Sequence, residues 1–537
     1  MAQIQETHNS AVPRSAWDIF HSGRGAWIIL AVAFLLRLWT AHGTFLNPDE
    51  ALHYRVANKA SLLLAYNFSL TTAHPPLLIL FLYFWRKIGV SELVLRFPSI
   101  VAGTAFCWIF YKWVSARFGK EAGWVTLIFV SFLPPLVALS AEVRQYAFLL
   151  FFMAAGMYLL DLALASNSLP CLLLSMACVY LAMLVHYSAL LFAASLGFYA
   201  LLRILKRRPA IRVMAAWVIG QLGAAGLFVF LYVSHISTLK ANGAAHSTIE
   251  GWMRNSFYHR GQDNLLLFIT ARTFGVFQFV FGQLAMGDVG LLLFAAGVVM
   301  LVRKRIAPQS DSTGLATFLV VPFVLTCIAA VIGLYPYGGT RHSAFLALFA
   351  IAGVSLALSN VRIRGVSGHT LALAIVLIAT SFGSPHRPYM RREDQSRGLM
   401  DSAISTIHEQ VGTGAVIFVD PQTSLQLGHY LCEQKLTPRD TAIAGFESYY
   451  CGGYHVITPA NNVMIFDSST FLREWDAMVR AFALKQGEPV YVAQAGWDIH
   501  LAQDLRQLSG FEDLKSQWFG RNISFFKLVV NQPKERQ

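Results

Sequence analysis

The sequence predicts a polytopic all-α membrane domain followed by a small α/β domain outside the cytoplasm. Of its 537 residues, 55% are hydrophobic and only 13% are charged, whereas soluble domains carry about 25% charged residues. From about Pro385 the composition becomes that of a soluble domain. Before that point we expect eleven apolar segments long enough to cross a bilayer, about 17–25 residues each: 25–42, 93–115, 121–139, 145–164, 169–186, 188–204, 212–235, 287–302, 315–334, 341–359 and 367–383.

Two other apolar segments are expected not to cross. Leu77–Lys87 is too short and ends on Trp85, Arg86 and Lys87, which favours a helix lying in the interface. Leu265–Gln283 is interrupted by Arg272 and Gln278, and a further span there would place the following basic loops on the wrong side of the membrane. The first apolar run lacks a cleavage pattern behind it and is interpreted as a retained anchor.

Basic residues predict the orientation. The net charge of +13 is explained by Lys and Arg in cytoplasmic loops, not by nucleic-acid binding. With the N-terminus (1–24) inside, the inner loops hold Arg117, Lys120, Arg203, Lys206, Arg207, Arg208, Arg303, Lys304, Arg305, Arg362 and Arg364. Residues 25–384 then form the transmembrane domain, with a first external loop at 43–92, and 385–537 lie outside.

Strand-like and helix-like segments alternate in the C-terminal region, which indicates an α/β domain. The expected strands are Ala415–Val419, Pro489–Ala493 and Ile523–Val530, and the expected helices are Ser424–Leu431, Phe471–Leu484 and Ile499–Leu508. Of the six cysteines, four lie in apolar runs, and no zinc pattern is present. Cys432 and Cys451 lie outside the cytosol, where a disulfide can form, and the sequence leaves their pairing open.

Charged residues without a role in topology all fall on the external face. Asp49 and Glu50 follow the first span directly, and further polar residues lie in four other external stretches: Arg55, His74, Arg96, Glu142, Arg144, Tyr335, Arg341 and His342. Each has a structural alternative, since acids can cap a helix and Arg96 can snorkel from a helix end. Their gathering on one face favours a functional site.

The chemistry of such a site is narrow. Guanidinium groups match phosphate oxygens bidentately, so several arginines can hold the phosphate of a lipid carrier. A carboxylate beside them can take a proton from a hydroxyl or amine acceptor. Lipid phosphate then leaves with charge stabilisation from arginine or a divalent metal. The residues therefore predict sugar transfer from a polyprenyl-phosphate-linked donor.

At these residues the chain resembles the GT-C class of membrane glycosyltransferases. The nearest groups are the dolichyl-phosphate-mannose–protein mannosyltransferase-like proteins, the RgtA/B/C/D-like branch and the lipid A aminoarabinose transferases. The resemblance covers residues 25–205 well and the remainder loosely, and it runs through Pro48-Asp49-Glu50, His74-Pro75-Pro76-Leu77, Leu95-Arg96-Phe97-Pro98-Ser99, Glu142-Val143-Arg144-Gln145-Tyr146-Ala147 and Tyr335-Pro336 to Arg341-His342. His74 departs from the aminoarabinose transferases, which tend to have Lys at that position.

The resemblance implies an inverting transferase of the bacterial inner membrane whose site faces the periplasm. Asp49 would be the catalytic base with Glu50 assisting, and Arg96, Arg144 and Arg341 would face the donor phosphate or stabilise the site. Some members use a divalent cation, which Asp49, Glu142 or a histidine could hold. The acceptor would be lipid A, a polysaccharide or glycolipid, or a protein.

Two other classes of function are weighed against this one. A transporter or flippase of a lipid-linked substrate would carry ionisable groups at mid-membrane and repeated halves, neither of which is visible. A non-catalytic envelope assembly protein would tolerate Asp49→Asn.

Overall fold

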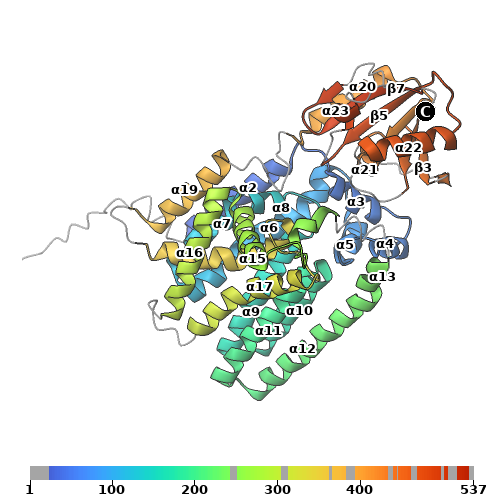
Figure 1. Ribbon diagram of the computed structural model, residues 1–537. Helices are drawn as coiled ribbons and strands as arrows, with labels where there is room; N and C mark the ends of the chain where they lie inside the picture. Colours follow the sequence, from blue (N-terminus) through green and yellow to red (C-terminus); the bar gives the residue numbers. More distant parts are fainter. Residues whose placement is uncertain are drawn as a thin grey trace, which may run out of the picture.

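The protein consists of a helical membrane domain with a C-terminal sheet domain at one end (Figure 1). The computed structural model describes residues 23–241, 251–303, 312–361, 366–382, 394–432, 440–443, 445–460, 468–497, 501–505 and 517–530. The helices of the membrane domain are α2 (Gly23–Ala41), α3 (Pro48–Ala57), α4 (Leu62–Ser69), α5 (Leu77–Trp85), α6 (Glu92–Phe118), α7 (Lys120–Phe132), α8 (Pro134–Ser140), α9 (Tyr146–Ser166), α10 (Leu169–Val185), α11 (Ser188–Arg207), α12 (Ile211–Leu231), η1 (Tyr232–Ile236), α13 (Ser237–Ala241), η2 (Arg254–Ser256), α15 (Leu265–Phe281), α16 (Leu284–Val302), α17 (Ser312–Val331), η3 (Arg341–Leu346), α18 (Ala347–Ser359) and α19 (Gly368–Ser381).

All eleven segments that we expected to cross the bilayer are helical. Eight helices of the described chain are long and apolar enough to span a membrane, and the bent pair α7–α8 makes a ninth candidate. The other two expected spans correspond to the shorter apolar helices α10 and α19. The segment Leu265–Gln283, which we expected not to cross, forms α15. This helix is as long as α10, at 17 residues. Helix length therefore does not separate α15 from the expected spans, and the number eleven stays a prediction.

A buried arginine compensates for the break between α7 and α8. Pro134 and Pro135 have no N–H, so the carbonyls of Val130 and Ser131 lose their helical partners, and the chain bends by 60°. Arg37 on α2 is fully buried and donates to both carbonyls, at 2.8 and 3.1 Å. The bend is thus hydrogen-bonded inside the membrane domain, and it directs the chain into the loop that carries Glu142 and Arg144.

The C-terminal domain is built on one seven-stranded sheet in the order β2-β3-β4-β1-β5-β7-β6. Strand β1 runs parallel to β4 and β5, and the other neighbours are antiparallel. The elements are α20 (Arg397–Gln410), β1 (Val416–Val419), α21 (Pro421–Tyr430), β2 (Asp440–Ile443), β3 (Phe446–Cys451), β4 (Tyr454–Pro459), α22 (Ser468–Ala481), β5 (Pro489–Ala495), α23 (Leu501–Leu505), β6 (Gln517–Phe519) and β7 (Ile523–Val529).

This arrangement confirms the expected small α/β domain and each of its six expected elements. The sequence interpretation missed α20 and strands β2, β3, β4 and β6. Several expectations concern residues outside the described ranges: the N-terminal residues 1–22, the domain boundary at 384–385, the basic residues Lys304, Arg305, Arg362 and Arg364, and both ends of the expected helix 499–508.

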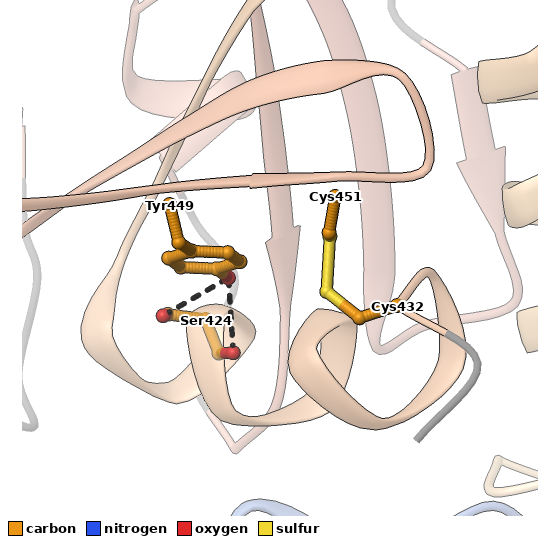
Figure 2. Close-up of a disulfide and its surroundings, with 4 residues drawn as sticks. All are labelled: Ser424, Cys432, Tyr449 and Cys451. Carbon is orange, nitrogen blue, oxygen red and sulfur yellow. Dashed lines mark hydrogen bonds between the residues drawn. A yellow bond between two sulfur atoms is a disulfide. The ribbon is translucent and has the colours of Figure 1, made fainter. Parts of the chain in front are cut away.

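The two cysteines whose pairing the sequence left open are joined. Cys432, just after α21, and Cys451, at the end of β3, form a disulfide with their Cα atoms 5.1 Å apart (Figure 2). Nearby, the Tyr449 hydroxyl contacts both the hydroxyl and the carbonyl of Ser424 at 3.2 Å. The disulfide and these hydrogen bonds fasten α21 to the sheet.

The C-terminal domain is joined to the loop between α2 and α3 by main-chain hydrogen bonds. The Phe45 N–H donates to the Gln395 carbonyl at 2.9 Å, and the Arg397 N–H donates to the Gly43 carbonyl at 2.8 Å. Side chains of α21 add to this contact, since Gln426 donates to the Leu46 carbonyl and the Leu46 N–H donates to the Tyr430 hydroxyl. The segment that leads into α3 is therefore hydrogen-bonded both to residues 395–397 and to α21.

Candidate active site

The first-loop acids begin helix α3. Asn47 is the N-cap, and its side chain accepts from the Glu50 N–H while the Glu50 carboxylate accepts from the Asn47 N–H, both at 3.0 Å. Pro48 occupies the first turn, where no N–H is needed. The sequence Asn-Pro-Asp-Glu is thus a capping box that fixes both carboxylates on the first turn of a helix.

Glu50 and Arg96 form a buried, bidentate ion pair. Nε and Nη2 of Arg96 donate to the two Glu50 oxygens, each at 2.7 Å, and both side chains are at most 1% exposed. Arg96 also donates to the carbonyl of Ala41 at the end of α2, to the carbonyls of Thr44 and Phe45 in the first loop, and to the Thr44 hydroxyl. Glu50 accepts a further hydrogen bond from the Val143 N–H at 2.8 Å. These contacts join the first loop, α6 and the loop after α8.

Asp49 contacts two arginines from distant parts of the chain. Its Oδ2 atom lies 2.8 Å from Nη1 of Arg144 and 2.5 Å from Nη2 of Arg341. Arg144 is buried, and its Nε has no hydrogen-bond partner among the described residues. Three stretches that are far apart in the sequence therefore converge on one carboxylate, as expected from their predicted placement on one face.

The two arginines keep Asp49 ionised. Burial by itself would raise its pKa, but the charges of Arg144 and Arg341 outweigh burial and hold the pKa of Asp49 well below its usual range. In this state Asp49 is a weak base. It would become a stronger one if its cationic partners were taken up by an anion.

A backbone contact positions Arg341. Gly338 has a φ of 146°, and a Cβ on Gly339 would lie 2.7 Å from the Gly275 carbonyl, so this glycine pair lets the loop touch α15 directly. The Tyr335 hydroxyl donates to the His342 carbonyl at 2.9 Å and closes the same loop. Tyr335 thus supports the loop that carries Arg341.

The C-terminal domain adds an aromatic wall beside Arg341. The guanidinium carbon of Arg341 lies 5.6 Å from the ring centre of Trp497, just after β5. The indole Nε1 is buried and has no hydrogen-bond partner among the described residues. Sequence interpretation missed Trp497, because no local pattern connects the end of this strand with a loop more than 150 residues earlier.

Four histidines are stacked next to the two arginines. The rings of His53, His74, His186 and His342 lie with centroids 5.2–6.3 Å apart along His53–His74, His74–His186 and His74–His342. The Asp49 carbonyl accepts from Nδ1 of His53 at 2.6 Å. Burial, followed by the charge of Arg144, lowers the pKa of His53 to about 4, so the imidazole is neutral at physiological pH.

Only His74 and His342 of this stack were among the expected site residues. His53 is four positions after Asp49 in the same helix, so its place on the Asp49 face follows from helical spacing once α3 is known. His186 sits between α10 and α11 without a sequence signal of its own.

Glu142 is a second acid near Asp49, and its pKa is raised, not lowered. Its side chain is 9% exposed, and Oε2 is buried without a hydrogen-bond partner among the described residues. Burial, followed by the charge of Glu50, raises the pKa of Glu142 to about 7. Asp49 and Glu142 therefore form a pair of carboxyls whose pKa values are moved in opposite directions.

The residues around Asp49 include the donor types that a divalent metal ion uses. Carboxylates and neutral imidazoles are suitable donors, and Nδ1 of His342 and Nε2 of His186 have no hydrogen-bond partner among the described residues. However, no three of the described His, Cys, Asp and Glu residues are arranged to hold a metal ion. No step of the reaction is derived through a metal ion.

Arg55 is the one expected site residue that lies apart from the others. It is on the opposite side of α3 from Asp49 and faces Glu447 of β3, with Nη2 3.7 Å from Oε2. The structure thus brings Asp49, His74, Glu142, Arg144, Tyr335, Arg341 and His342 together, places Glu50 and Arg96 behind them, and separates Arg55.

The fold and part of the sequence match known proteins. The family described as dolichyl-phosphate-mannose-protein mannosyltransferase matches residues 73–233. The crystal structure of ArnT from Cupriavidus metallidurans bound to undecaprenyl phosphate has a TM-score of 0.51 to this chain at 13% identity, covering 95% of this chain and 99% of that one. Its apo form gives a TM-score of 0.50 at 13% identity, with coverage of 96% and 100%. No curated protein sequence matches the chain.

These matches define the class of protein. The chain is an integral membrane protein with the GT-C glycosyltransferase fold, which confirms the fold and the resemblance expected from the sequence. Within that class, residues 73–233 match the mannosyltransferase family.

Proposed function

We propose that the protein is an inverting glycosyltransferase that moves a sugar from a polyprenyl-phosphate donor to an acceptor outside the cytoplasm. The observation that carries this proposal is the contact of Asp49 with both Arg144 and Arg341. A carboxylate between two arginines combines a base with an anion site in one place. The GT-C fold and the binding of undecaprenyl phosphate by ArnT support a lipid phosphate as the anion.

The donor phosphate and Asp49 compete for the same two guanidinium groups. Arginine binds phosphate oxygens with short, charge-assisted hydrogen bonds, and the unpaired Nε of Arg144 is available for one of them. As the phosphate engages Arg144 and Arg341, their attraction for Asp49 falls and the pKa of Asp49 rises. Donor binding thus activates the base.

The transfer itself is a single displacement. The acceptor hydroxyl or amine attacks the anomeric carbon, a new glycosidic bond forms, and the bond from that carbon to the phosphate oxygen breaks. Asp49 takes the acceptor proton. The bonding electron pair leaves with the polyprenyl phosphate, whose charge Arg144 and Arg341 stabilise. Attack opposite to the leaving group inverts the anomeric centre.

We assign Glu50 and Arg96 a positioning role, which for Arg96 is the second of the two roles expected from the sequence, stabilisation of the site. Every hydrogen-bonding nitrogen of Arg96 is engaged by protein oxygens, which leaves no donor for a phosphate. Their pairing holds the first turn of α3, and with it Asp49, against the loop of Glu142 and Arg144. The proposed location is the bacterial inner membrane, with this site and the C-terminal domain in the periplasm.

The test is direct transfer. Membranes containing the protein are given a radiolabelled polyprenyl-phosphate sugar and envelope extract, and we expect label to leave the polyprenyl fraction and appear in a glycan, lipid or protein fraction. Membranes from cells lacking the protein are the control. Equal transfer in both membranes would contradict the proposal, as would movement of intact labelled donor across the bilayer without cleavage.

We expect the rate to rise with pH through the pKa of Glu142. As a carboxylate, Glu142 can hold the hydroxyl or amine of the acceptor through its unpaired Oε2. The raised pKa of about 7 means that this carboxylate forms only as the pH passes neutrality. The measurement is kcat/KM for transfer between pH 5.5 and 8.5. The wild type should show an inflection near 7, and Glu142→Gln should lose it.

The raised pKa of Glu142 also predicts that stability falls as the pH rises, whereas the transfer rate rises. Because the folded-state pKa lies above the unfolded value, the stabilising contribution of protonated Glu142 is complete below about pH 4.5 and is lost as the pH rises through 7. Glu142→Gln should therefore be at least as stable as wild type at pH 8 while transferring more slowly. An inflection near 7 that persists in this variant would contradict the assignment.

A further inference from the structure

A side chain of the C-terminal domain lies in direct contact with the active site. Strand β5 ends at Ala495, and Trp497 follows it after one glycine. The guanidinium carbon of Arg341 lies 5.6 Å from the centre of the indole ring, within the limit of about 6 Å for a cation–π interaction. The same guanidinium forms the ion pair with Asp49. The C-terminal domain therefore contacts one of the two arginines that face the proposed base.

The main chain at Trp497 is held by α21 and packs against the start of α3. The Trp497 N–H donates to Oε1 of Gln422 at 3.2 Å. Gly496 has a φ of 137°, and a Cβ there would lie 2.5 Å from the same Oε1 and 3.2 Å from Cγ of Pro48, so the position favours glycine. Pro48 is the first residue of α3, which lies next to α21 (Figure 1). The indole is thus placed by the same contact that holds the helix of Asp49.

An indole ring attracts a guanidinium without offering it an oxygen acceptor. The ring face acts through its quadrupole, and the indole Nε1–H is a donor only. Among the residues that the structure describes, Arg341 donates side-chain hydrogen bonds to Asp49 alone, whereas the donors of Arg96 are taken by protein oxygens. A phosphate that binds Arg341 therefore has the Asp49 carboxylate to displace, and Trp497 does not compete with it.

A contact with Trp497 matters most when Arg341 changes its partner. In the proposed reaction the donor phosphate takes Arg341 from Asp49, so this ion pair breaks in every cycle. The side chain of Arg341 is 19% exposed, against 3% for that of Arg144, so packing restricts Arg341 less. A long side chain that loses its ion pair regains rotamer freedom, and ordering it again weakens binding. A contact that does not depend on Asp49 limits this freedom.

We propose that Trp497 is a positioning residue, which keeps the Arg341 guanidinium at the phosphate site while its ion pair passes from Asp49 to the donor. The proposal rests on the proposed transferase function, since the anion is the phosphate of that donor. It gives the C-terminal domain a part in donor binding through one indole ring. Loss of the ring should weaken phosphate binding and leave Asp49 and Arg144 in place.

The first experiment measures the binding of radiolabelled undecaprenyl phosphate to the full chain in detergent. Trp497→Leu should weaken binding by about 3- to 30-fold, the range expected for one cation–π interaction. Trp497→Phe keeps an aromatic face and should recover part of the loss. The control is Trp518→Leu, which removes a tryptophan that is 38% exposed on β6 of the same domain and should bind as wild type.

Thermal unfolding of each variant in detergent checks the fold. Wild-type binding by a folded Trp497→Leu protein would overturn the proposal. An equal loss in Trp497→Leu and Trp497→Phe would also overturn it, because the loss would then come from packing and not from the ring face. If Trp497→Leu does not fold, Trp497→Phe decides. Its ring face is weaker than that of tryptophan, so weaker binding supports the proposal and wild-type binding overturns it.

Transfer kinetics separate this proposal from the proposed function. Trp497→Leu should raise the KM for the donor by the same factor as it weakens binding, and should leave the KM for the acceptor unchanged. If the wild type transfers sugar and Trp497→Leu keeps its donor KM, the positioning role is overturned and the proposed function stands. If the wild type transfers no sugar while undecaprenyl phosphate binding still depends on Trp497, the proposed function fails and the positioning role is supported.

Discussion

Asp49→Asn is expected to reduce sugar transfer by about 10²- to 10⁴-fold, the usual contribution of a positioned general base. Asparagine has nearly the same shape but cannot accept the acceptor's proton. It also removes the carboxylate that Arg144 and Arg341 share, so the donor phosphate meets no competitor for them. Binding of donor should therefore be kept or strengthened while the chemical step fails. The measurement is the initial rate of transfer and the donor KM at equal expression.

A matched control separates chemistry from charge. Asp476→Asn removes an exposed carboxylate from α22 of the C-terminal domain and should transfer at the wild-type rate. Thermal unfolding of both variants in detergent checks that the fold is intact. Full activity in a folded Asp49→Asn protein would refute the catalytic role of Asp49 and would favour a non-catalytic assembly protein.

Arg96→Met is expected to lower the free energy of unfolding by about 3–5 kcal/mol, the usual cost of leaving one partner of a buried ion pair alone. Glu50 is fully buried and would lose both of its charge-assisted hydrogen bonds. The carbonyls that Arg96 holds in the first loop would lose their donors as well. Thermal or denaturant unfolding in detergent measures the change.

The double variant Glu50→Gln/Arg96→Met tests the explanation. Because it removes the unpaired charge, it should be more stable than Arg96→Met alone. Arg473→Gln is the control, since the Arg473 side chain is 69% exposed in its pair with Glu474 and surface pairs contribute roughly 0–1 kcal/mol. An Arg96→Met protein as stable as wild type would contradict the positioning role.

The composition of the site could be predicted from the sequence because the basic residues in the loops predict which side of the membrane each loop faces. Once basic loops were assigned to one side, Asp49, Arg144 and Arg341 fell on the other, and the structure brings them into contact. Which arginine pairs with which acid could not be predicted. Arg96 and Arg144 are both buried arginines near the outer ends of helices, and only their packing decides that Arg96 meets Glu50 and Arg144 meets Asp49.

Some of the structural features that were not predicted have a recognisable pattern in the sequence, and others have none. The hairpin of β3 and β4 has one, because Gly452 and Gly453 adopt φ of 60° and 92° in a two-residue turn between Tyr-rich strands. The direction of Arg55 follows from helical spacing, since it is six positions after Asp49 and about 120° away around the helix. Trp497 has no such signal, because its place depends on how two domains pack.

The hydrogen bond between Phe45 and Gln395 joins two residues that are synthesised far apart in time. These residues are 350 positions apart, so at about 5–20 residues per second roughly 20–70 s of synthesis separate them. During that time the loop between α2 and α3 is without the segment that completes it, and Glu50 lacks its contact with Gln395. A chain that stops late in synthesis would therefore have its membrane helices but not the segment that completes the surroundings of Glu50.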